Sequence, residues 1–142
     1  VEPNPTRAAS LRGLGVDVIE AAVTTRPGPV TLWVTDRDEG SSILKPLTTY
    51  RTVAGVAVPT VRLDDILDVN VLVVDVQGAE CEVLDSGDLT RFDLVVVEVS
   101  DSARYAGGAT RRDVEARFDG WDLVAEYPHP ASPGLSDLVY QQ

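Results

Sequence analysis

The sequence predicts an α/β fold in which a doubly wound, mostly parallel sheet is followed by a C-terminal antiparallel hairpin. Residues 69–76 and 92–99 are short apolar runs rich in β-branched side chains, which is typical of strands covered on both faces. Segments with helix signals alternate with these runs, as in βαβ units. The 142 residues are about one domain's worth of chain, so we treat residues 1–142 as a single domain.

The first element is the end of a strand followed by a helix. Residues 1–2 have the pattern of the last residues of a strand. Asn4 followed by Pro5 is typical of a helix N-cap and the first helical position. Two glycines flank Leu14, so the helix should end there.

Short strands and loops follow the first helix. The pattern predicts strands over 16–23 and 30–34 that are separated by a turn rich in proline and glycine. Residues 36–52 are polar and read as a surface loop. The remaining elements of this part are a short strand over 56–58 and 60–61 and one or two helical turns over 63–67.

The second half carries the strongest pattern. A buried strand over 69–76 leads into a helix over 79–86, and a second buried strand covers 92–99. Thr110 opens another helix, with Asp113 completing a weak capping box. Residues 121–127 and 136–140 are spaced as the two strands of the hairpin.

Composition limits the partners. The formal net charge of −11 argues against nucleic acid, because phosphate binding needs a basic surface. No apolar run reaches the roughly 20 residues that span a bilayer, so no membrane partner is expected. Cys81 is the single cysteine and cannot form an internal disulfide, which favours a cytoplasmic location.

Three acids follow apolar strands at the edge where α/β sheets bind ligands. Glu2 could accept hydrogen bonds from ribose hydroxyls, or it could simply favour the N-terminus of the next helix. Asp75 could orient a substrate hydroxyl or take its proton, or it could satisfy backbone donors of the turn at Gly78 together with Glu80. Glu98 could line a substrate pocket or lie in a surface loop.

The segments resemble, in this order, the FkbM family of S-adenosylmethionine-dependent methyltransferases. The matching pieces are VEPNP at 1–5, the strand end at 21–23, GSS at 40–42, VPTVRLDDIL at 58–67, VVDVQGAECEVL at 73–84 and LVVVEVS at 94–100. The resemblance covers nearly the whole chain, and DVQGAE is its most specific part. It implies a Rossmann-like methyltransferase sheet and methyl transfer from S-adenosylmethionine to a hydroxyl of a small metabolite or sugar, without a metal.

The resemblance also implies roles for individual residues. Glu2 matches the acid that binds the cofactor ribose, Ala21 or Ala22 would approach the adenine, and Asp75 would lie near the methyl-transfer site. We therefore predict cofactor-binding residues Glu2, Asn4, Ala21, Ala22 and Asp75, a catalytic role for Asp75, and substrate-binding residues Gln77, Glu80 and Glu98. His129, the one histidine, could act as a base because imidazole titrates near neutral pH, but a histidine in a proline-rich hairpin loop is more often an ordinary surface residue.

The family begins with a strand and a glycine-rich loop that the printed sequence does not show, since it opens at the second strand. We expect the protein to continue upstream; a partner that fills the gap and a remnant without cofactor binding are the alternatives. Three functions compete on this basis: an O-methyltransferase, a non-catalytic binding or scaffold domain that could form a homodimer, and an unrelated nucleotide-binding module.

Overall fold

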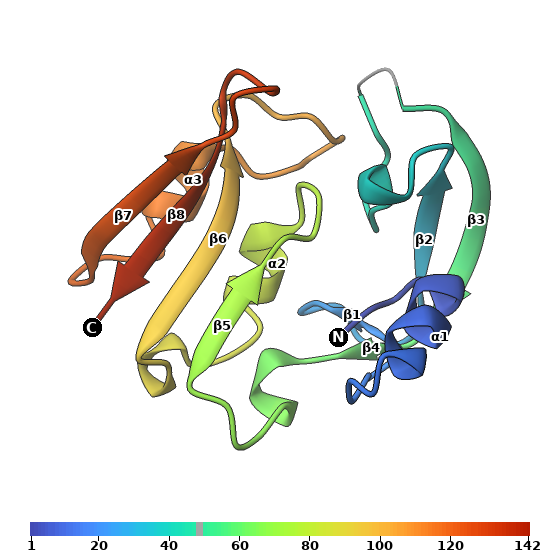
Figure 1. Ribbon diagram of the computed structural model, residues 1–142, viewed down its shortest axis with the longest axis horizontal. Helices are drawn as coiled ribbons and strands as arrows, with labels where there is room; N and C mark the ends of the chain where they lie inside the picture. Colours follow the sequence, from blue (N-terminus) through green and yellow to red (C-terminus); the bar gives the residue numbers. More distant parts are fainter. Residues whose placement is uncertain (48–49) are drawn as a thin grey trace.

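The computed structural model describes residues 1–47 and 50–142 (Figure 1). Its helices are α1 (Pro5–Gly13), α2 (Glu80–Leu84) and α3 (Arg111–Glu115), with single 3₁₀ turns η1 (Asp38–Gly40), η2 (Leu63–Asp65) and η3 (Leu89–Arg91). Its strands are β1 (Ala22–Val23), β2 (Val30–Thr35), β3 (Thr52–Val58), β4 (Thr60–Val61), β5 (Val71–Val74), β6 (Leu94–Ser100), β7 (Asp122–Pro128) and β8 (Leu135–Gln141).

The C-terminal half is built around a four-stranded sheet with the order β5-β6-β8-β7. β5 and β6 run parallel, whereas β8 is antiparallel to both β6 and β7. Alternation along β6 sends Val95, Val97 and Val99 to one face, where they are at most 3% exposed. Side chains of α2 and α3 pack on this same face and form the main core with Phe92 and Leu138.

The opposite face of this sheet is open. Val71 and Val73 of β5 are 50% and 69% exposed. Val73 lies next to Val96 of β6, which pairs with Val139 of β8. Among the described residues, β5 pairs with β6 alone, so its other edge carries no strand. The sheet is therefore covered by described helices on one face only.

The N-terminal half forms two short ladders and a smaller core. β1 and β4 pair in parallel, and β2 and β3 pair antiparallel. Ala22, Leu32, Ile43, Val58 and Ala79 are the buried residues of this second core. Figure 1 shows this half, with α1, lying beside the sheet of the other half.

Several sequence predictions are confirmed. α1 begins at Pro5, and the Asn4 side chain caps it by accepting a hydrogen bond from the Thr6 amide at 3.0 Å. The capping box of Thr110 and Asp113 at α3 is present. β7 and β8 form the expected antiparallel hairpin.

Three predictions differ from the structure. The described ladders are mixed, with two parallel and three antiparallel pairs, so a mostly parallel and doubly wound sheet is not confirmed. The strand expected over 16–23 is reduced to Ala22–Val23. Val16 and Ile19 are 52% and 43% exposed, so no buried face favours an extended ladder there. The last residue of the loop expected over 36–52, Thr52, is the first residue of β3, and residues 48–49 of that loop lie outside the described residues.

No helix within the described ranges is both long enough and apolar enough to cross a bilayer.

Candidate functional site

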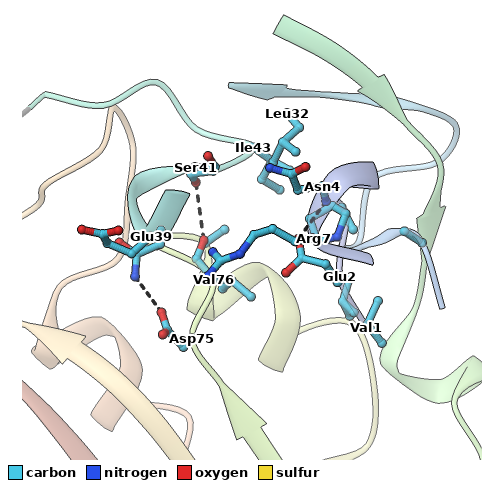
Figure 2. A pocket seen from close by; sticks show the side chains of 17 residues that line it. Val1, Glu2, Asn4, Arg7, Leu32, Glu39, Ser41, Ile43, Asp75 and Val76 are labelled. Carbon is cyan, nitrogen blue, oxygen red and sulfur yellow. Dashed lines mark hydrogen bonds between the residues drawn. The ribbon is translucent and has the colours of Figure 1, made fainter. Parts of the chain in front are cut away.

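A pocket lies between the N-terminal half and the turn that follows β5 (Figure 2). Residues far apart in the sequence line it, and all five predicted cofactor-binding residues are among them. Its lining residues are Val1, Glu2, Pro3, Asn4, Arg7, Ala21, Ala22, Val23, Leu32, Glu39, Ser41, Ser42, Ile43, Asp75, Val76, Gln77 and Ala79. The structure thus brings Glu2 and Asp75 to one cavity.

Glu2 is held at the rim of the pocket by the start of α1. One carboxylate oxygen of Glu2 accepts a hydrogen bond from the Asn4 amide at 2.7 Å, and the Glu2 amide donates to the Ile19 carbonyl at 3.0 Å. A carboxylate can accept about four hydrogen bonds, so this contact orients Glu2 without using its capacity. The Asn4 side chain is buried and serves as the cap of α1.

Small and apolar residues form part of the pocket wall. Ala21 and Ala22 are 2% and 4% exposed, and Leu32 and Ile43, which also line the pocket, are buried. Alanine side chains leave room for a flat group to approach the backbone, while the aliphatic side chains offer an apolar contact. This wall suits a heterocyclic ring.

Arg7 adds a cation that the sequence interpretation missed. Figure 2 shows its side chain reaching from α1 across the pocket toward Val76. Three acids, Glu2, Glu39 and Asp75, line the same pocket and outnumber this one cation. The lining is therefore acidic on balance and favours a ligand that carries positive charge.

The turn after β5 is strained and tightly packed. Gln77 has φ of 59° and Gly78 has φ of 93°, both in the left-handed region. A Cβ on Gly78 would lie 2.7 Å from Cδ2 of Tyr105, so position 78 needs glycine for space as well as for conformation. The Gly78 amide donates to the Glu80 carboxylate at 2.8 Å, which closes the turn onto α2.

Gln77 connects the acids on either side of this turn. Its Nε2 donates to Asp75 at 2.6 Å and to Glu98 at 3.2 Å. Its Oε1 accepts from the buried Tyr105 hydroxyl at 2.9 Å. The Tyr105 hydroxyl also lies 3.1 Å from the Gly40 carbonyl, and its single hydrogen serves one of the two at a time. A non-glycine residue held at positive φ by such contacts is characteristic of functional sites.

A smaller pocket adjoins the first one at Gln77. It is lined by Gln77, Gly78, Glu80, Glu98, Val99, Ser100, Arg104, Tyr105, Ala109 and Leu135. The three predicted substrate-binding residues, Gln77, Glu80 and Glu98, thus share one cavity that is separate from the Glu2 side. The two pockets have Gln77 and the turn of β5 in common.

Burial and nearby negative charges raise the pKa values of the two glutamates that line this second pocket. Burial raises the pKa of Glu80, which is only 4% exposed, although backbone hydrogen bonds in the turn oppose the shift. Burial, with the charges of Asp75 and Glu80, raises the pKa of Glu98 to about 7. Glu80 is therefore a structural element of the turn, whereas Glu98 is poised to exchange a proton near neutral pH.

His129 and Asp137 join Glu98; the sequence analysis favoured a surface role for His129 and did not single out Asp137. The hydrogen bond from His129 to Asp137 spans 3.0 Å, and His129 lies 3.9 Å from Glu98. Asp137 meets Glu98 through the register of the sheet, which pairs the two residues and which no local sequence pattern shows. In the part of the chain that the structure describes, these three residues also form the one group of ligand atoms, all within 4.8 Å of one another, that could hold a metal ion.

These features of the first pocket suit a ligand that carries a positive charge and a flat ring. Glu2 suits ribose hydroxyls, the alanine wall suits a ring, and the acidic lining suits a sulfonium or ammonium group. Gln77 lines both pockets, and Asp75, which its side chain contacts, lines the first, so two bound molecules would meet beside these residues.

Comparison with known proteins agrees with this geometry. Residues 1–127 match the family described as the methyltransferase FkbM domain. The chain is 29% identical over 153 aligned residues to the 2-O-methyltransferase NoeI of Sinorhizobium fredii (strain NBRC 101917 / NGR234). The match covers 89% of this chain and 63% of that protein, so the chain spans less than two thirds of its relative's length. No solved structure matches the chain.

Proposed function

This chain belongs to the FkbM methyltransferase family, and from that premise we propose that it acts as an S-adenosylmethionine-dependent O-methyltransferase on a hydroxyl of a small metabolite or sugar. The observation that carries the proposal is the presence of Glu2 and Asp75 in one pocket, beside a second pocket that shares Gln77. The name of the relative, a 2-O-methyltransferase, supports an oxygen as the methyl acceptor.

The cofactor, when bound, would supply a methyl group activated by a positively charged sulfur. The chain would contribute placement, because methyl transfer in line depends mainly on alignment of the attacking oxygen. Glu2 would bind the ribose hydroxyls, and Ala21 and Ala22 would bound the adenine. Asp75 would orient the acceptor hydroxyl, with its carboxylate fixed by Gln77.

Calorimetric titration with S-adenosylhomocysteine tests the cofactor site. Glu2→Ala should weaken binding at least about tenfold, since one charged hydrogen-bond acceptor contributes about 1.5–3 kcal/mol. Glu2→Gln should lie between this variant and the original protein, because the amide still accepts the Asn4 N–H. Asp17→Asn is a matched control: Asp17 is exposed and lies outside the pocket lining. Equal affinities in all variants would contradict the role of Glu2, and preference for another nucleotide would favour an unrelated nucleotide-binding module.

Transfer of a radiolabelled methyl group to a panel of methyl glycosides and simple alcohols tests the reaction. Asp75→Asn should lower kcat by about 10²-fold or more, while the affinity for S-adenosylhomocysteine changes little. Cofactor binding without transfer to any member of the panel would contradict the proposed acceptor class.

A non-catalytic scaffold domain is the second candidate, and the open face of the four-stranded sheet favours it. Exposed Val71 and Val73 and the unpaired edge of β5 could be covered by a second copy of the chain. Light scattering should then show a homodimer, and calorimetry should show no binding of S-adenosylhomocysteine. A monomer that binds the cofactor analogue contradicts this candidate.

A further inference from the structure

Three carboxylates lie side by side on the open face of the four-stranded sheet, and we call Asp75, Glu98 and Asp137 the carboxylate row. Glu98 and Asp137 are register partners on β6 and β8. Asp75 follows Val74, the last residue of β5, which pairs with Val97 on β6. His129 follows β7 directly and reaches the same row.

The contact with Asp137 fixes how His129 presents its ring. Nε2 of His129 lies 3.0 Å from Oδ2 of Asp137. An ionised carboxylate only accepts hydrogen bonds, so Nε2 carries the hydrogen and Nδ1 of the neutral ring keeps its lone pair. Nδ1 is the nitrogen that faces Glu98, 3.9 Å from its Oε1. The pair thus directs a proton-accepting nitrogen toward Glu98.

The space between His129 and Glu98 suits a hydroxyl oxygen. Two atoms 3.9 Å apart can both lie at hydrogen-bond distance, about 2.8 Å, from a third atom placed off the line that joins them. A hydroxyl in this position could donate its hydrogen to Nδ1 while its oxygen accepts a hydrogen bond from Glu98 in the protonated form. His129 is partly exposed, with a side chain 33% accessible, so a substrate can approach it.

Gln77 connects this place to the proposed methyl-transfer site. The same Nε2 donates to Glu98, at one end, and to Asp75, at the other. Asp75 lines the pocket that contains Glu2, and Glu98 lines the second pocket. A hydroxyl held beside Glu98 is therefore near the junction where the two pockets meet.

We propose that His129, held by Asp137, is the general base that takes the proton of the methyl-acceptor hydroxyl, and that Glu98 positions this hydroxyl. The proposal rests on the methyltransferase function proposed above. It assigns the acceptor side of the reaction to the hairpin loop and the carboxylate row.

The step is balanced in atoms and charge. The acceptor oxygen forms its bond to the methyl carbon, and the electron pair of the methyl–sulfur bond stays with the sulfur. The proton of the hydroxyl moves to Nδ1 of His129. The resulting imidazolium is stabilised by Asp137, which accepts from Nε2–H.

The charges around His129 favour this role. The hydrogen bond to Asp137, followed by the charges of Asp137, Glu98 and Asp75, raises the pKa of His129 above its usual 6.5. The charge of Glu80, on α2, raises the pKa of Glu98, whereas the charge of His129 lowers it. The pKa of Glu98 is about 7, the pKa of His129 is raised, and each group shifts the pKa of the other, so the pH dependence of the reaction reflects both groups together.

A metal ion is the competing occupant, because His129, Glu98 and Asp137 offer ligand atoms within 4.8 Å of one another. Binding by Nε2 and Asp137 would have to break the hydrogen bond between them. The present contact already has the geometry of a carboxylate–imidazole pair, so the general base is favoured. Treatment with a metal chelator distinguishes a metal site from a general base, because only a metal site would lose activity.

The first test reads His129 directly and needs no cofactor. His129 is the only histidine, so every imidazole resonance in a ¹H–¹⁵N titration belongs to its ring. The pKa of His129 should lie above 6.5, with the hydrogen on Nε2 in the neutral ring, and Asp137→Asn should lower it measurably. Asp122→Asn removes the same charge from an exposed position at the far end of β7 and should leave it unchanged. An unaltered titration in Asp137→Asn, or a hydrogen on Nδ1, overturns the proposal.

The second test uses methyl transfer to the fastest acceptor of the glycoside panel. His129→Gln should lower kcat by about 10²–10⁴-fold, with affinity for S-adenosylhomocysteine unchanged. Imidazole added to His129→Ala should restore part of the rate. The acidic limb of the pH profile should move to lower pH in Asp137→Asn and stay in place in Asp122→Asn.

The outcomes separate this inference from the proposed function. Transfer at the original rate in His129→Gln overturns the general base alone. Loss of activity with a chelator, restored by Mn²⁺ or Zn²⁺, overturns it in favour of a metal site. Absence of cofactor binding in the unmodified chain overturns the methyltransferase proposal and this inference together.

Discussion

The two faces of the β5-β6-β8-β7 sheet differ although the same strands build both. On the covered face, Val95, Val97 and Leu138 are fully buried against α2 and α3. On the open face, Glu98 and Asp137 alternate with these residues and remain partly exposed. Because successive side chains of a strand point to opposite faces, the same strands carry the apolar core residues on one face and the ionisable residues on the other.

The open face can carry acids because water still reaches it. The side chain of Glu98 is 12% accessible and that of Asp137 is 37% accessible. On the covered face, the same carboxylates would need buried partners to offset desolvation. Burial, followed by the charges of Asp75 and Glu80, still raises the pKa of Glu98 to about 7.

Truncation of a covered residue should have the largest effect. Leu138 is 0% exposed, so Leu138→Ala should lower the free energy of unfolding by about 2–5 kcal/mol through lost burial and a cavity. Val73→Ala on the open face should cost no more than about 0.5 kcal/mol, since Val73 is 69% exposed. Urea unfolding measures both. A large loss in Val73→Ala would show that the open face is covered in solution.

Gly78→Ala should have the next largest effect: it should lower the free energy of unfolding by about 1–3 kcal/mol and should also reduce methyl transfer. Alanine would meet both the positive φ and the close Tyr105 ring. Gly107→Ala is the matched control, because Gly107 has φ of 73° but nothing within 4 Å of an added Cβ. The difference in unfolding free energy between the two variants isolates the contact with Tyr105. Equal losses would mean that the turn adjusts without cost.

The raised pKa of Glu98 should make the free energy of unfolding fall with rising pH. The pKa of Glu98 is 4.5 in the absence of shifts and about 7 in the fold, so the folded state binds this proton more tightly. Its contribution is present below about pH 4.5 and is lost as pH rises to about 7.

Glu98→Gln removes this contribution. Relative to the original protein, the variant should gain about 1–2 kcal/mol of unfolding free energy between pH 4.5 and 7, a value reduced for partial solvent screening. Urea unfolding at several pH values measures the difference. A difference that is independent of pH would contradict the raised pKa.

Tyr105→Phe should have the smallest effect, about 1 kcal/mol or less, because it removes one hydroxyl from a buried ring. Gln77 Oε1 would lose the donor at 2.9 Å, and the link between Asp75 and Glu98 should loosen. We expect kcat to fall more than the unfolding free energy would suggest. Unchanged kcat would show that Tyr105 does not help to hold Gln77.

The sequence by itself determined the order of the elements and the family. The apolar runs predicted β5 and β6, the capping residues predicted α1 and α3, and DVQGAE carried the resemblance that the family match confirmed. These signals are local, since propensity, capping and strand alternation act over a few residues. Glu2 and Asp75 could be named in advance because a motif marked each of them.

Only the tertiary structure decided which residues meet. Gln77 bridges Asp75 and Glu98 because of its left-handed backbone, and no local pattern shows where its amide points. His129 reaches Glu98 because β8 pairs antiparallel with both β6 and β7. Register and strand order are set by packing between distant segments, so a histidine that reads as surface in the sequence lies beside a half-buried acid in the fold.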